Sequence, residues 1–157
     1  MESTVMQKHS VGIVQRVSFA LALLLCAAAA ARAQEAAPAL ELKDTAGRDV
    51  KLADYAGKPV VLNFGATWCG PCVKEMPIFV EAAKKYEAQG LVVLAASLDA
   101  PETQQNIAPF IEKQKMEFPV LVGTNIDHMK EFGMGAVLPG TIFIDQQGKV
   151  LGRILGQ

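Results

Sequence analysis

Short apolar runs alternate along this chain with longer stretches in which apolar residues recur every three or four positions. The short runs are rich in β-branched residues and are typical of buried strands, whereas the longer spacing is typical of helices with one buried face. The predicted strands are residues 60–64, 91–97, 118–122 and 142–145, and the predicted helices are residues 69–89, a stretch starting at 99–102, and 126–132. Strands that alternate with helices predict an α/β fold with parallel neighbours in the sheet and helices on both faces.

A β-hairpin is predicted at each end of this region. Residues 40–43 and 50–52 flank a polar turn, and residues 142–145 and 150–154 flank a second turn that contains Gly148. The second hairpin is expected to lie at the edge of the sheet.

The longest helix is predicted for residues 69–89 and should end at Gly90. Pro77 lies inside it and predicts a kink, because proline has no backbone N–H to donate. The residues expected to bury one face of this helix are Met76, Phe79, Val80, Ala83 and Tyr86.

The first 33 residues have a different composition. Lys8 and Arg16 precede an apolar stretch at residues 17–31, and Ala31-Arg32-Ala33 has the small residues that signal peptidase prefers. We therefore predict a signal peptide at residues 1–33, a linker at 34–39 and one domain at 40–157. The alternative is an uncleaved membrane anchor, although the apolar stretch is shorter than the roughly 20 residues that span a bilayer.

The composition narrows the possible functions. The chain has 157 residues, 51% of them hydrophobic, which is enough for one domain with a core. Its formal net charge of −1, without a basic cluster, argues against a nucleic-acid partner. Of the three cysteines, Cys26 lies in the predicted signal peptide, so the domain keeps Cys69 and Cys72.

These two thiols stand where the strand at 60–64 gives way to the helix at 69–89. Free backbone N–H groups and the helix dipole favour a thiolate at Cys69, which makes it the attacking sulfur. Cys72 lies one turn further on, where it can attack a mixed disulfide formed at Cys69. A zinc site would need two more ligands, and only His128 remains in the domain, so we expect no metal and no cofactor beyond a redox-active disulfide.

Trp68-Cys69-Gly70-Pro71-Cys72 is the thioredoxin signature. Residues 58–64 before it and Glu75-Met76-Pro77 after it resemble the TlpA/ResA-type branch of bacterial extracytoplasmic proteins, and the resemblance runs from about Pro38 to the last residue. It implies a thioredoxin fold with an N-terminal β-hairpin and a central insertion near residues 99–132. Related sequences continue into a C-terminal helix, which is expected to be absent here, through truncation or with one sheet face left partly uncovered.

The resemblance also implies roles for residues beside the thiols. Trp68, Gly70 and Pro71 are expected to contact a docked substrate. Glu75 is expected to be partly buried, with a raised pKa that suits it to take the Cys72 proton; the alternative is an ordinary solvated helix residue. Thioredoxins carry a buried aspartate where this chain has Asn63.

A second implied element is the loop at Leu138 and Pro139. The peptide bond between them is expected to be cis, with Pro139 against the disulfide and the Leu138 backbone free to pair with a substrate strand; the alternative is an ordinary turn proline. Gly140 replaces a usual threonine and is expected to loosen this loop. Gly65 replaces a frequent aromatic residue and is expected to open space beside the thiols.

We therefore predict an exported thiol-disulfide oxidoreductase, in the periplasm or on the outer face of the membrane, that reduces protein disulfides. Gly70-Pro71 matches reducing thioredoxins, with potentials of about −270 mV against about −120 mV for the strongest oxidant of the fold, but it does not fix the direction. A reductant there needs a membrane electron donor of the DsbD/CcdA type. By resemblance, its targets would be cysteines of apocytochrome c or of copper sites. The rival classes are a peroxiredoxin-like peroxidase and a non-catalytic binding module.

Overall fold

The computed structural model describes residues 35–156, so the predicted signal peptide lies outside the described residues. The elements are β1 (Glu41–Asp44), β2 (Asp49–Lys51), the 3-10 helix η1 (Leu52–Tyr55), β3 (Val60–Gly65), α2 (Gly70–Tyr86), η2 (Glu87–Gln89), β4 (Val92–Ser97), η3 (Gln104–Asn106), α3 (Ile107–Gln114), β5 (Val120–Val122), α4 (Ile126–Glu131), β6 (Gly140–Ile144) and β7 (Val150–Leu155). Over this range, no helix has the length and apolar character needed to cross a membrane.

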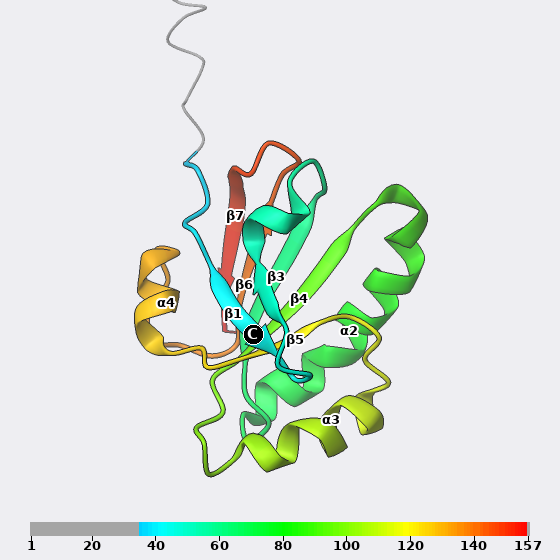
Figure 1. The fold of residues 1–157 in the computed structure, drawn as a ribbon, viewed down its shortest axis with the longest axis vertical. Coiled ribbons are helices and arrows are strands. Elements are labelled where there is room, and N and C mark those ends of the chain that lie inside the picture. The colour runs from blue at the N-terminus through cyan, green and yellow to red at the C-terminus, as the bar shows by residue number, and fades with distance from the viewer. Residues whose placement is uncertain (1–34, 157) are drawn as a thin grey trace, which may run out of the picture. The chain divides into compact units, whose positions relative to one another are not determined.

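The described strands form one sheet in the order β2-β1-β5-β4-β3-β6-β7. β3, β4 and β5 run parallel to one another, whereas both predicted hairpins are antiparallel. The N-terminal hairpin joins the sheet through antiparallel pairing of β1 with β5. Figure 1 shows α4 on one face of the sheet and α2 with α3 on the other, which is the predicted arrangement.

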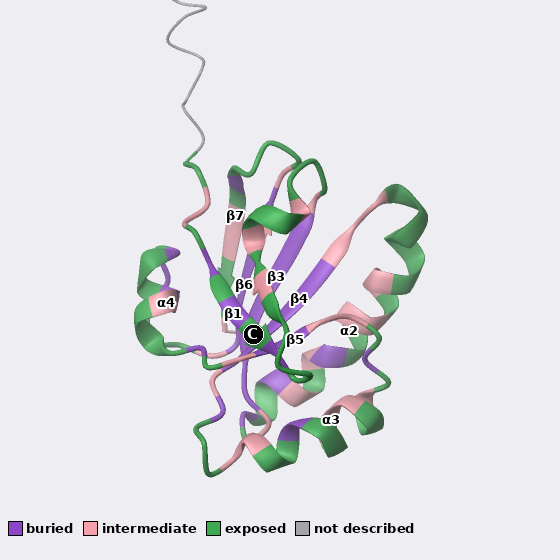
Figure 2. Cartoon of the chain, in the orientation of Figure 1, coloured by how far each residue is buried: buried purple, intermediate pink, exposed green. Residues whose placement is uncertain are grey.

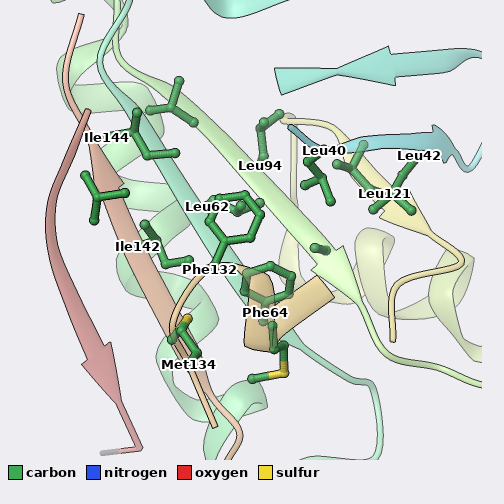
Figure 3. Packing of buried hydrophobic residues seen from close by; sticks show 14 residues of the cluster. Leu40, Leu42, Leu62, Phe64, Leu94, Leu121, Phe132, Met134, Ile142 and Ile144 are labelled. Carbon is green, nitrogen blue, oxygen red and sulfur yellow. The ribbon is translucent and has the colours of Figure 1, made fainter. Parts of the chain in front are cut away.

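The central strands carry the core. Buried residues gather along β3 and β4 (Figure 2), where alternate side chains point to opposite faces. On the α4 face, Leu62 and Phe64 pack with Leu94, Phe132 and Ile142 (Figure 3). The Phe64 and Phe132 rings lie 5.8 Å apart between centroids. The smaller cluster on the other face consists of Met76, Ala95, Ile107, Met116 and Val120.

Two helix predictions needed correction. Tyr86 is exposed, because the backbone leaves the α conformation there and tightens into η2 before Gly90 ends it at φ +80°. The helix expected to start at 99–102 becomes regular only at Ile107, after a turn and η3. Asp99 does not cap this helix, because its carboxylate accepts hydrogen bonds from Thr67 and Ser97 instead.

Residues 35–39, most of the predicted linker, lie along the β6–β7 hairpin. The Ala37 N–H donates to the Gly148 carbonyl at 2.9 Å, and the Val150 N–H donates to the Glu35 carbonyl at 2.8 Å. Glu35 also pairs with Arg153 at 2.7 Å. The segment is therefore attached to the sheet before β1 begins.

Candidate active site

Cys69 and Cys72 form a disulfide at the start of α2. Cys69 is the N-cap residue, and its Sγ accepts a hydrogen bond from the Cys72 N–H at 3.3 Å. This N–H belongs to the first helical turn, whose donors have no partner within the helix. Because a thiolate is a better acceptor than a thiol, the same donor would favour the ionised form of Cys69 once the disulfide opens.

The two sulfurs have different surroundings. A groove of about 960 Å³ passes Cys69 but not Cys72. Its walls come from Trp68 and Pro71, from the loop after β4, from Ile126 and Met129 of α4, and from Leu138. Both cysteines are buried in one cluster with Ala66, at 6% exposed for Cys69 and 1% for Cys72, so the groove is what distinguishes them. A partner in the groove therefore meets Cys69 first.

Trp68 and Gly70 flank Cys69 and are both exposed, although Cys69 itself is buried. Trp68 is 61% exposed, so its ring is available as an apolar surface. Gly70 is exposed, and a Cβ there would have no heavy atom within 4 Å. Open space therefore surrounds the first residue of α2.

The Leu138–Pro139 peptide bond is cis, as expected. Pro139 is fully buried, and its carbonyl accepts a hydrogen bond from the Gly156 N–H at 2.8 Å. Leu138 packs against the cysteine cluster, together with Leu98. Within residues 35–156 the Leu138 backbone has no backbone hydrogen-bond partner, so both of its polar groups are available.

Glu75 is half-buried on α2, one turn after Cys72. Burial raises the pKa of its carboxyl group, although a hydrogen bond from Asn63 works in the opposite direction. The Asn63 Nδ2 donates to Glu75 Oε1 at 2.8 Å, so the carboxylate is hydrogen-bonded to an amide and not to a sulfur. Glu75 is therefore connected to Cys72 indirectly, because its partner Asn63 lines the same small cavity as Cys72.

Asp99 is a site residue that the sequence analysis missed. It is 3% exposed and accepts hydrogen bonds from the Thr67 N–H at 2.9 Å, the Thr67 hydroxyl at 2.6 Å and the Ser97 hydroxyl at 2.7 Å. Burial acts to raise the pKa of Asp99, but these hydrogen bonds outweigh it and leave the pKa lowered. Asp99 thus fixes the loop that leads into Cys69.

A signal for Asp99 was present in the sequence. It follows β4, which pairs in parallel with β3, the strand before the cysteines. The carboxyl ends of neighbouring parallel strands meet at one edge of a sheet, where functional groups commonly gather.

The structure contradicts both expectations about glycine. Gly140 is buried in β6, and a Cβ there would lie 2.6 Å from Met134 Cε, so the segment is tightly packed and not loosened. A Cβ at Gly65 would lie 3.4 Å from Cys72 Cβ, so Cys72 itself occupies most of the expected space. What remains is a cavity of about 30 Å³.

The sequence model described as the AhpC/TSA family matches residues 33–153, most of the chain. The chain belongs to the AhpC/TSA family. Among relatives of this AhpC/TSA protein, the thiol-disulfide oxidoreductase ResA of Bacillus thuringiensis is 38% identical over 121 residues, covering 77% of the chain and 68% of the relative. ResA of Bacillus subtilis is 33% identical over 120 residues, covering 76% and 65% respectively.

Solved structures agree with these relatives. A protein from Chlorobium tepidum assigned as thiol:disulfide interchange protein DsbE superposes with a TM-score of 0.71 at 33% identity, over 78% of this chain and 84% of that one. The predicted thioredoxin-like α/β fold and the resemblance to ResA are confirmed. This AhpC/TSA protein is a thiol-disulfide oxidoreductase, and its CxxC disulfide is Cys69–Cys72.

Proposed function

We propose that this oxidoreductase reduces protein disulfides outside the cytoplasmic membrane, with the Cys69–Cys72 pair as its only redox group. The observation that carries the proposal is the unequal placement of the two sulfurs. Cys69 caps α2 and borders the groove, whereas Cys72 is sealed behind it. This arrangement suits a nucleophile followed by a resolving thiol.

In the first step, the Cys69 thiolate attacks one sulfur of the substrate disulfide. The substrate S–S bond breaks, its other sulfur leaves as a thiolate and takes up a proton, and a mixed disulfide with Cys69 forms. Cys72 then gives its proton to Glu75 and attacks Cys69 Sγ. The mixed disulfide breaks, the second substrate sulfur is protonated, and two electrons have passed to the substrate.

The groove provides for docking. An extended substrate segment would form backbone hydrogen bonds with Leu138, while Trp68, Gly70 and Pro71 contact the residues around its cysteine. The available N–H and C=O of Leu138 and the exposed Trp68 ring support this assignment.

The proposed compartment and partners follow from the N-terminal segment and the relatives. The pattern at residues 1–33 supports export, with a cleaved signal or a membrane anchor at the N-terminus. A reductant in an oxidising compartment would receive electrons from a membrane donor of the DsbD/CcdA type. Cysteines of apocytochrome c or of copper sites are the proposed targets.

Whether the protein reduces or oxidises its substrate is tested by the reduction potential of the Cys69–Cys72 couple, measured by equilibration with glutathione. A reductant should lie near the −270 mV of thioredoxins, and a value near −120 mV would make it an oxidant. The original protein should catalyse insulin reduction by dithiothreitol, and Cys69→Ser should abolish this activity. Equal rates for the original protein and Cys69→Ser would indicate a non-catalytic binding module. Peroxide consumption faster than insulin reduction would favour the peroxidase.

A further inference from the structure

Asn63 occupies a fully buried position of β3, on the face of the sheet that α2 covers, and is 1% exposed. Its Nδ2 donates two hydrogen bonds, to Glu75 Oε1 at 2.8 Å and to Thr141 Oγ1 at 3.1 Å. Its Oδ1 is buried and has no donor among the described residues. Buried carbonyl oxygens are nearly always paired, because water has been taken away from them. The amide therefore has one unused acceptor.

Gly65 shows where this acceptor points. A Cβ built on Gly65 would lie 3.5 Å from Asn63 Oδ1 and 3.5 Å from Cys72 Sγ. The two atoms therefore border the same small space, and Asn63, Gly65 and Cys72 all line the adjoining cavity of about 30 Å³. In the disulfide form, Cys72 Sγ has no hydrogen to donate. Reduction gives this sulfur a hydrogen.

We propose that Asn63 is a positioning residue whose Oδ1 accepts the thiol hydrogen of Cys72 in the reduced enzyme, while its Nδ2 holds Glu75. The proposal adds to the thiol-disulfide exchange of this protein and holds for either direction of electron flow. One amide would then connect the resolving thiol to the carboxyl group assigned to its proton.

Hydrogen bonding would thus distinguish the two cysteines. Cys69 Sγ accepts a backbone N–H, which favours its thiolate. Cys72 Sγ would donate to Asn63, which favours its neutral form, because a hydrogen bond made by the thiol is lost on ionisation. Cys72 would stay protonated until a substrate has reacted with Cys69.

The other polar side chains around Asn63 already have hydrogen-bond partners, so Asn63 Oδ1 is the acceptor that remains for the Cys72 thiol. Asp99 lines the same cavity, but both of its carboxylate oxygens already accept hydrogen bonds from Thr67 or Ser97. Glu75, the titratable group next to Asn63 on α2, is directed to Nδ2. Thr141 on β6 carries no titratable group and also binds Nδ2.

The first test compares the oxidised and reduced forms of the full-length protein by NMR. The 13Cγ resonance of Asn63 should move downfield on reduction, as a carbonyl carbon does when its oxygen accepts a hydrogen bond. Asn125 is the internal control, because its Oδ1 already accepts the N–H groups of Asp127 and His128. An Asn63 resonance that moves no more than that of Asn125 would overturn the proposal, and a water bound to Oδ1 in both forms would give that result.

The second test observes the thiol directly. In a Cys26→Ser, Cys69→Ser background, Cys72 is the only thiol, so the infrared S–H stretching band reports on it alone. The band should lie at lower frequency with Asn63 than with Asn63→Leu, which has no acceptor. Thr141→Val removes one of the two acceptors of Asn63 Nδ2 and should leave the band in place. Identical bands with Asn63 and Asn63→Leu would refute the hydrogen bond, and if Asn63→Leu does not fold, the NMR comparison decides.

Discussion

The two faces of β3 are buried equally but built differently. Leu62 and Phe64 point to the α4 face, where the core cluster is apolar throughout. Asn63 points to the α2 face, where it meets Glu75 and borders the same cavity as Asp99. Polar groups cost free energy when buried unless they are paired, so an apolar layer would give more stability. The contrast teaches that the α4 face carries the larger apolar cluster, while the α2 face combines a smaller apolar cluster with buried polar groups beside Cys72.

The largest expected effect is on the α4 face. Phe132→Ala should lower the free energy of unfolding by about 3–5 kcal/mol, because it removes a fully buried ring that packs on Phe64. Urea unfolding measures the loss, and insulin reduction per folded molecule should stay near the original rate. Tyr86→Ala, at an exposed aromatic position, is the control. A comparable fall in the activity of folded Phe132→Ala would contradict the division between the two faces.

The next effect concerns Asp99, at the edge of the α2 face. Asp99→Asn should lower the free energy of unfolding by about 2 kcal/mol, because a charged acceptor of three hydrogen bonds is replaced by a neutral one. Insulin reduction should also slow, since Asp99 holds Thr67 just before the active-site cysteines.

The pH dependence of stability provides a second readout for Asp99. The pKa of Asp99 in the folded protein lies below its ordinary value of 3.8, so its contribution to stability is present above pH 3.8 and is lost as the pH falls through the folded pKa. Asp99→Asn should remove this part of acid unfolding. Glu102→Gln, at an exposed carboxyl group, is the control for charge alone. If the acid-unfolding curve of Asp99→Asn matches that of the original protein, the hydrogen bonds from Thr67 and Ser97 to Asp99 do not contribute to stability.

Gly140 tests how closely the α4 face is packed. Gly140→Ala should cost about 1 kcal/mol, because the new Cβ meets Met134 Cε, the flexible end of a buried side chain that has to move. Met134→Val shortens that side chain, so adding Gly140→Ala to it should cost less than in the original protein. Additive losses measured by urea unfolding would mean that the two residues do not touch.

Periodicity predicted the fold because it depends on many residues at once. The strands, both hairpins and the helix after the cysteines required only apolar spacing and turn residues. The Asp99 network was missed because it depends on a contact between loops 32 positions apart. Gly140 was misinterpreted because its constraint is the packing of the Met134 side chain, which apolar spacing does not reveal. The cysteines were found because their spacing is local, whereas the Asn63 contact with Glu75 spans 12 positions and a strand-to-helix crossing.

The smallest effect on stability is expected at Glu75, and its sign is opposite to that of Asp99. Because burial raises the pKa of Glu75 above its ordinary value of 4.5, the folded state binds the proton more tightly than the unfolded state does. Stability should therefore fall as the pH rises from 4.5 to the folded pKa, and stay level above it. Glu75→Gln keeps an acceptor for Asn63 Nδ2 but cannot ionise, so urea unfolding between pH 4 and 8 should lose this decline. Glu81→Gln, on the exposed side of the same helix, should retain it. If the Glu75→Gln and original curves coincide, the carboxyl group is not held in a desolvated site, and the proton of Cys72 must go elsewhere.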